Sequence, residues 1–131
     1  MKKILSTFIL LFAFNGTSAA SEIIQEVSVT QVQQLIASKA TDFAILDANN
    51  DAARKEIGTI QGAILLTSYN QYALDELPTD KNTHLVFYCY NSYCQASHAA
   101  AERAISAGYK DAKVLKVGIV GWKKALAKKV H

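Results

Sequence analysis

The feature that most constrains the fold is an alternation of short apolar strands with helical segments. Five segments are predicted strands, at residues 23–27, 43–46, 63–66, 84–88 and 113–117. Helical segments lie between most of them, and the strands are apolar on both faces. This pattern is typical of a mostly parallel sheet covered by helices on two sides. We therefore predict an α/β fold with a mostly parallel central sheet of about five strands and helices on both faces.

The predicted helices have recognisable ends. Ser28 and Gln31 match a capping box, and apolar residues at helical spacing follow them. The alanine-rich segment 95–107 forms a second helix, and Gly108 is well placed to end it. Two more helices are expected, a short one that ends near Ile57 and a final one that begins at or contains Gly121 and Trp122.

The N-terminus has the layout of a secretory signal peptide. Lys2 and Lys3 form a short basic start, residues 4–14 are almost unbroken apolar sequence, and small residues end the segment at Ala20. The apolar run is shorter than the roughly 20 residues that a membrane-spanning helix needs. We therefore expect cleavage before Ser21, which divides the chain into a signal peptide, residues 1–20, and a single periplasmic domain, residues 21–131. Cleavage after Ala19 fits nearly as well, and an uncleaved N-terminal membrane anchor is the alternative.

The charge of the exported part argues against nucleic-acid binding. Lys2 and Lys3 are two of the 14 basic residues, and all 11 acidic residues follow residue 20, so the remainder carries a net charge of only +1. Half of all residues are hydrophobic and 19% are charged, which is typical of a folded globular domain. After signal cleavage, we expect no contact with a membrane.

Both cysteines lie between a predicted strand and a predicted helix. Cys89 follows the strand directly, and Cys94 comes after four loop residues, Tyr90, Asn91, Ser92 and Tyr93. Successive backbone N–H groups of such a loop can form an anion-binding concavity, and the helix start adds unpaired donors. These donors would stabilise a thiolate, so we expect a lowered pKa and a nucleophilic sulfur at Cys89. A buried structural cysteine is the alternative.

Three separated segments resemble the rhodanese-like domain family. Ile45–Asp47, followed by Gly58–Ala63, resembles the family's strand–aspartate and G-H-I-P-G-A segment. Leu85–Cys89 resembles the strand that delivers its active-site cysteine. The stretch from Ala107–Tyr109 to Val117–Trp122 resembles its A-G-(aromatic)…G-G-I-x-x-W ending. The segments occur in the family's order and cover most of the predicted domain.

The resemblance implies sulfur transfer through a persulfide on Cys89. A small sulfur donor loads the cysteine, and a thiol, a protein thiol or cyanide unloads it, which is covalent catalysis by an activated thiolate. His98 has no accompanying set of metal ligands, and we expect neither a metal nor a cofactor.

The loop departs from the family pattern in its charges. Family loops often carry arginine or another cation, whereas residues 90–93 carry none. Thr59 stands where histidine is usual, and Asn49 stands where arginine often follows the aspartate. Stabilisation of a dianion such as thiosulfate would then rest on backbone N–H groups and a cation from elsewhere, such as Arg54 or His98.

Other functions remain open at this stage. Cys94 could attack a persulfide on Cys89, release its outer sulfur as sulfide and close a Cys89–Cys94 disulfide, or it could protect Cys89 from over-oxidation. A thiol–disulfide redox protein that uses both cysteines and a catalytically inactive binding module are therefore alternatives. Related phosphatases place an arginine after five intervening residues, where this chain has Gln95, so we do not expect phosphatase activity.

Two polar residues are expected to support the site, and two aromatic residues to line its mouth. Asp47 ends a strand near Cys89, and a carboxylate there more often hydrogen-bonds loop backbone than takes part in chemistry. His98 lies one turn into the following helix. Tyr90 and Tyr93 are expected at the pocket mouth, where they would favour a flat or apolar acceptor.

Overall fold

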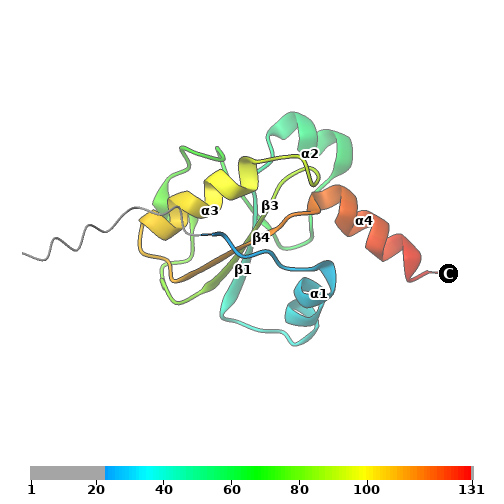
Figure 1. Cartoon of the computed structure of the whole chain (residues 1–131), viewed down its shortest axis with the longest axis horizontal. Coiled ribbons are helices and arrows are strands. Elements are labelled where there is room, and N and C mark those ends of the chain that lie inside the picture. The colour runs from blue at the N-terminus through cyan, green and yellow to red at the C-terminus, as the bar shows by residue number, and fades with distance from the viewer. Residues whose placement is uncertain (1–22, 131) are drawn as a thin grey trace, which may run out of the picture.

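Strands and helices alternate along the chain from β1 onward. The computed structural model describes residues 23–130, so the predicted signal peptide, residues 1–20, and its cleavage site before Ser21 lie outside the described residues. The elements are α1 (Val29–Ala37), β1 (Phe43–Asp47), α2 (Asp51–Ile57), β2 (Ile64–Leu65), the short 3-10 helix η1 (Leu74–Glu76), β3 (His84–Tyr88), α3 (Ala96–Ser106), β4 (Asp111–Leu115) and α4 (Gly118–Lys128) (Figure 1).

The sheet has four parallel strands in the order β2-β1-β3-β4. The predicted α/β architecture is confirmed, but the prediction of a strand at 23–27 is wrong. That segment forms only one bridge, between Glu26 and Val114. Its chain turns away immediately afterwards because Ser28 caps α1, so no ladder can develop along the edge of β4. The last strand also lies two residues earlier than predicted, since Val117 is already the N-cap residue of α4.

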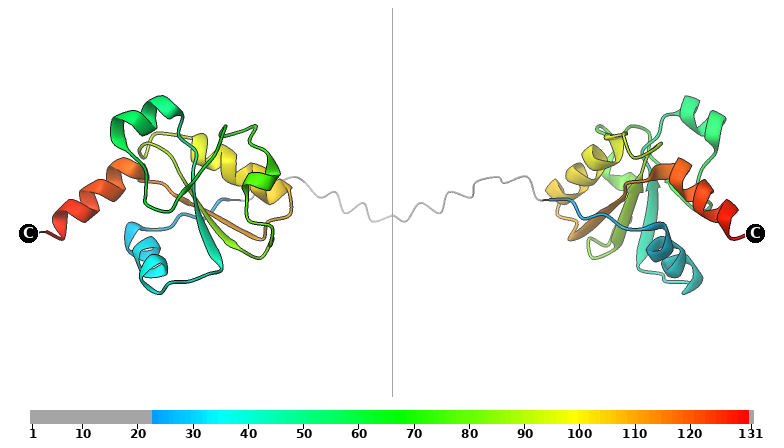
Figure 2. Two further views of the ribbon diagram at one scale, coloured as in Figure 1. Left: turned by 180° about the vertical axis from the view of Figure 1, so that it is seen from behind. Right: turned by 45° about the vertical axis from the view of Figure 1, so that its right-hand side comes forward.

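Helices cover both faces of the sheet, as Figure 2 shows. Because successive side chains of a strand point to opposite faces, Leu85 and Phe87 face α3, whereas Val86 faces α1 and α4. The buried stripe of α3 consists of Ser97, Ala100, Ala101 and Ala104. The opposite layer buries one valine of α1 and two residues of α4, namely Val32, Ile119 and Trp122.

The ends of α1 and α3 match the sequence signals closely. The Ser28 N–H donates to Gln31 Oε1 at 2.8 Å and the Gln31 N–H donates to Ser28 Oγ at 3.1 Å, which completes the predicted capping box. At the end of α3, Gly108 follows the last cap residue with a φ of +98°. The next N–H, that of Tyr109, donates back to Ala104 O at 3.1 Å, which is the hydrogen bond of a Schellman motif.

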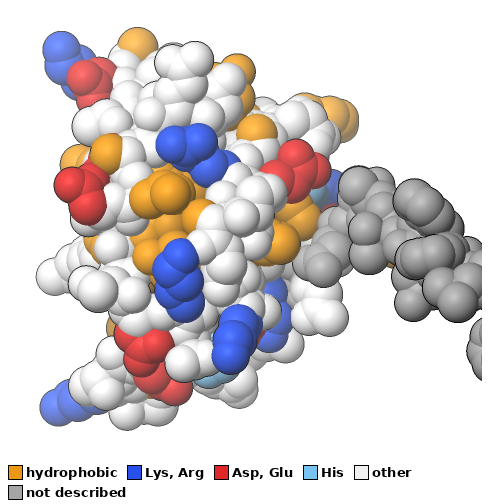
Figure 3. Space-filling view, turned by 90° about the vertical axis from the view of Figure 1, so that its left-hand side faces the viewer, with side chains coloured by type: hydrophobic (Ala, Val, Ile, Leu, Met, Phe, Trp, Pro, Cys, Tyr) orange, Lys and Arg blue, Asp and Glu red, His pale blue; other side chains and the backbone are white. Residues whose placement is uncertain are grey.

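The surface carries charges of both signs. On the face drawn in Figure 3, Lys and Arg side chains and Asp and Glu side chains lie around a group of hydrophobic side chains. Within residues 23–130, no helix has both the length and the apolar character that crossing a membrane requires.

Candidate functional site

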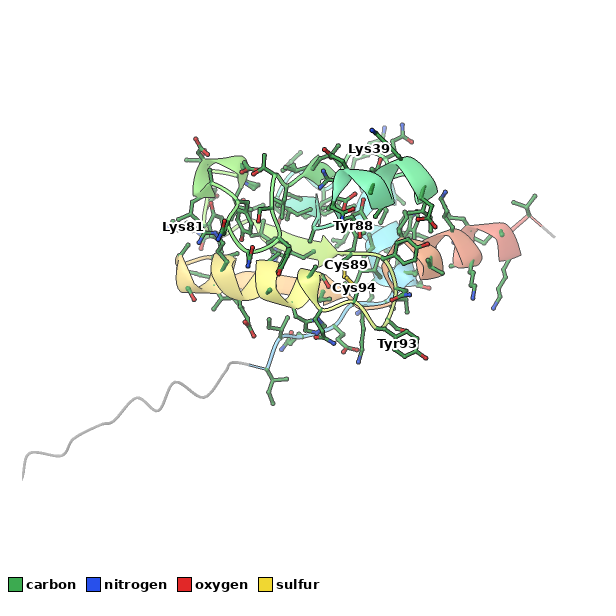
Figure 4. All side chains as sticks on the ribbon, turned by 90° about the horizontal axis from the view of Figure 1, so that it is seen from above. Lys39, Lys81, Tyr88, Cys89, Tyr93 and Cys94 are labelled. Atoms are coloured by element: carbon green, nitrogen blue, oxygen red, sulfur yellow. The ribbon has the colours of Figure 1, made fainter. Side chains whose placement is uncertain are left out.

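β3 delivers Cys89 to the carboxyl edge of the sheet. Tyr88 ends the strand and Cys89 follows at once, with only 1% of its surface exposed. Its side chain belongs to the cluster of buried residues on the α3 face. Figure 4 shows Cys89 and Cys94 next to each other at the end of the β3 arrow. Both cysteines are free thiols.

Three groups contact the Cys89 sulfur, one of which is the Ser97 backbone N–H. Sγ lies 3.3 Å from Ser97 Oγ and 3.4 Å from the carbonyl oxygen of Cys94, to which the thiol donates. Ser97 is buried on the first turn of α3. The thiol is therefore held between a hydroxyl that can stabilise a thiolate and a carbonyl that stabilises the protonated form.

The expectation of a lowered pKa at Cys89 is wrong for this arrangement. Burial raises the pKa of the thiol to about 11, and the hydrogen bond to Cys94 O adds to the increase, whereas the Ser97 groups lower it. Two N–H groups of the loop make their hydrogen bonds within the loop instead of to the sulfur. The Cys94 N–H donates to Asn91 O at 3.1 Å, and the Tyr93 N–H donates to Asn91 Oδ1 at 3.1 Å.

The start of α4 anchors the cysteine loop. The Ile119 N–H donates to Cys89 O and the Val120 N–H donates to Tyr90 O, both at 3.0 Å. Gly118 makes this close approach feasible, because it has a φ of +64° and a Cβ at this position would lie 2.5 Å from Tyr90 O. The close contact between α4 and the cysteine loop therefore requires glycine at position 118.

The two loop tyrosines have different surroundings. The Tyr90 hydroxyl donates to Glu56 Oε1 at 2.9 Å, which ties the loop to α2. Tyr93 is 87% exposed and points away from the two cysteines in Figure 4. Ser92 is also exposed. Tyr93 therefore projects into solvent and does not cover the thiol.

Asp47 lies at the end of β1 in a separate buried network. Tyr88, its neighbour in the β1–β3 register, donates its hydroxyl to Asp47 Oδ2 at 2.8 Å. The Asn49 N–H donates to Oδ1 at 2.7 Å, and Arg54 Nε lies 3.5 Å from Oδ2. The Tyr88 hydroxyl accepts from the Ile60 N–H at 3.0 Å, and burial together with Asp47 raises the pKa of Tyr88. Asp47 thus hydrogen-bonds loop backbone and fixes the strand that precedes Cys89.

Arg54 and His98, the two basic residues that the sequence suggested for binding an anion, have different hydrogen-bond partners. Arg54 donates to the carbonyl oxygens of Asp47 and Leu66 at 3.0 and 2.8 Å, so its guanidinium is bound within the Asp47 network. His98 Nδ1 and Asn49 Nδ2 are buried and have no hydrogen-bond partner within residues 23–130. In the same part of the chain, no three metal-ligating side chains gather into a site. Of the residues expected at the site, the structure brings Cys89 and Cys94 together, and it adds Ser97, whose hydroxyl contacts the Cys89 sulfur.

Residues 28–125 match the family model of the rhodanese-like domain. The chain belongs to the rhodanese-like domain family. The match includes both the Asp47 network and the cysteine loop. A search of curated proteins found no match.

Several solved structures share the fold at low sequence identity. The BH2092 protein of Bacillus halodurans is 23% identical with a TM-score of 0.69, over 78% of this chain and 73% of that one. The human single-domain sulfurtransferase TSTD1 is 21% identical with a TM-score of 0.61, over 78% and 97%. RPA3614 of Rhodopseudomonas palustris, described as a possible tyrosine phosphatase, is 21% identical with a TM-score of 0.64, over 78% and 81%.

Sequence reasoning missed Ser97, although a signal for it exists. The buried stripe of α3 has the spacing of one helix face, and Ser97 is its only polar member. A polar residue on the face that packs against the sheet, one turn after a strand-end cysteine, has few partners available besides that cysteine. Ser97 is therefore part of the candidate site.

Proposed function

We propose that this protein is a sulfurtransferase that carries sulfane sulfur as a persulfide on Cys89. The observation that carries the proposal is the buried Cys89 thiol at the end of β3, next to Ser97 Oγ, in a member of the rhodanese-like family. The proposed partners are a small sulfur donor and an acceptor thiol or cyanide, with no metal or cofactor.

Two displacements complete the proposed cycle. The Cys89 sulfur attacks the sulfane sulfur of the donor and forms an S–S bond, the donor's bond to that sulfur breaks, and the electron pair leaves with the rest of the donor. The thiol proton passes to solvent. An acceptor thiolate or cyanide then attacks the outer sulfur, and Cys89 leaves as a thiolate.

The resting thiol needs help to react at neutral pH. Its pKa of about 11 keeps it protonated, and Ser97 is the contacting group that favours the thiolate. We infer that donor binding displaces the hydrogen bond to Cys94 O and leaves the sulfur with the Ser97 hydroxyl as a donor. Phosphatase chemistry is not proposed, because Gln95, an exposed residue, takes the place of the guanidinium that would clamp a phosphate.

A thiol–disulfide function is a second candidate because Cys89 contacts the main chain of Cys94. Cys94→Ser separates the two functions, since persulfide transfer needs one thiol and a dithiol cycle needs two. Under the leading proposal, Cys94→Ser still forms the persulfide.

Intact-mass spectrometry tests the proposal directly. Reduced protein is treated with several sulfur donors, including thiosulfate, and then with cyanide. We expect a mass gain of one sulfur atom on Cys89, its removal by cyanide with formation of thiocyanate, and neither event in Cys89→Ser. If no donor places sulfur on Cys89, the proposal fails.

We also propose that the protein acts in the periplasm after removal of residues 1–20. N-terminal sequencing of the protein recovered from a periplasmic fraction should begin at Ser21. Recovery of a chain that begins at Met1 from the membrane fraction would contradict this localisation.

A further inference from the structure

An apolar groove lies on the face of the sheet opposite α3. It runs between α1, α4 and the loop after α2, with a cavity volume of about 570 Å³. Ile60, Ile119 and Trp122 form its buried floor, and Ile36 and Leu126, each 41% exposed, form its rim. The two helices that border it lie on the same side of the sheet in both views of Figure 2.

The charge at this groove has one sign. Lys123 is the only charged side chain that lines it, and Thr59 and Gln61 are the neutral polar ones. Within residues 23–130, Lys123 forms no salt bridge. Its ammonium group lies close to Gly58, beside the mouth of the groove. An occupant with a negative charge at this end would complement the unpaired ammonium.

We propose that this groove binds a small molecule with an apolar chain and one carboxylate group. Its volume lies within the range of small-molecule sites, about 300 to 1,000 Å³, and such sites combine mostly apolar walls with a few placed polar groups. The apolar chain lies against Trp122 and Ile119, and the carboxylate pairs with Lys123.

This site is separate from the thiol. The Cys89 side chain packs on the α3 face, whereas the groove floor belongs to the cluster on the other face. The inference therefore does not depend on the proposed sulfur transfer. The two sites are connected through the Ile119 N–H, which donates to Cys89 O.

Trp122 provides the test because it is the only tryptophan of the chain. Purified protein is titrated with decanoate below its micelle concentration, and decanol serves as the uncharged control. We expect a saturable blue shift of Trp122 fluorescence with decanoate. Lys123→Gln should weaken decanoate binding by about threefold, as expected for one partly solvated ion pair, and leave decanol binding unchanged.

Two variants keep the test specific. Lys124→Gln removes a neighbouring exposed charge that does not line the groove, and it should leave decanoate binding unchanged. Thr59→Phe places a ring in the groove from an exposed position and should abolish the fluorescence shift, with circular dichroism as the check on folding. Equal weakening by Lys123→Gln and Lys124→Gln, or binding only to anionic vesicles and not to monomeric decanoate, would overturn the proposal.

Discussion

Asp47 and Cys89 occupy neighbouring strand ends, yet their surroundings are opposite. Both side chains are buried at the carboxyl edge of the sheet, Asp47 at the end of β1 and Cys89 just after β3. The Asp47 carboxylate has a backbone N–H, a phenol and a guanidinium around it. The Cys89 sulfur has the hydroxyl and the backbone N–H of Ser97 and one carbonyl oxygen around it.

The difference shows that position at a strand end does not by itself make a residue reactive. A carboxylate with all its partners is held in one place and stabilises the fold. A buried thiol with few partners is stable while protonated, and in the proposed cycle it becomes available once the donor changes its hydrogen bonds. The partners of a group, more than its position in the fold, therefore separate the structural role of Asp47 from the chemical role that we propose for Cys89.

The largest expected effect is a loss of folding stability when the Asp47 carboxylate is removed. Asp47→Asn should lower the free energy of unfolding by about 3 kcal/mol or more, because it leaves the part-buried Arg54 guanidinium without its one buried carboxylate partner. Asp51→Asn is the matched control, since Asp51 also pairs with Arg54 at 3.2 Å but its side chain is 88% exposed. Its effect should stay within about 0.5 kcal/mol. Urea unfolding measures both, and equal losses would contradict a structural role specific to Asp47.

The second prediction concerns the loss of folding stability at alkaline pH that the raised pKa of Cys89 causes. The folded pKa of about 11 lies above the ordinary value of 9.0, so the unfolded chain loses this proton first as the pH rises. The stabilisation is complete below about pH 9 and is lost between pH 9 and 11. Wild-type protein should therefore lose about 2 kcal/mol more than Cys89→Ser between pH 8 and 10.5 in urea unfolding. Parallel losses in the two proteins would show that the Cys89 pKa is not raised.

The smallest expected effect is a change in the alkylation rate of Cys89 when the Ser97 hydroxyl is removed. Ser97 lowers the pKa of Cys89, so Ser97→Ala should leave less thiolate near pH 8 and slow alkylation of Cys89 by about threefold, as expected for one hydrogen bond. The measurement uses iodoacetamide in a Cys94→Ser background. Ser92→Ala, an exposed residue of the same loop, is the control and should leave the rate unchanged. A faster reaction in Ser97→Ala would contradict the assigned role.

Local signals predicted much of the fold because they act over a few residues. The capping box at Ser28 and the glycine after α3 depend on neighbours three to five positions away, and both appear where the sequence places them. The segment at 23–27 failed as a strand because its pairing depends on how much of the β4 edge it can reach. That length is set by the whole sheet and not by the apolar pattern.

The position of the Cys89 thiol could be predicted from the sequence, but the direction of its pKa shift could not. The apolar run 84–88 followed by Cys89 places the thiol at the carboxyl edge of the sheet, as found. The sign of its pKa shift depends on where the loop N–H groups point, and Asn91 takes two of them for its own oxygens. The residue types in the loop do not indicate which way its backbone N–H groups point.

The contact between α4 and the cysteine loop also has a consequence for biosynthesis. Residues 118–120 come late in the chain, and their N–H groups hold the carbonyls of Cys89 and Tyr90. A chain synthesised from its N-terminus therefore presents its thiol well before the segment that anchors the cysteine loop has been made. The last helix to be made completes the cysteine loop, so a chain that stops before Gly118 would carry Cys89 without the hydrogen bonds that hold its loop.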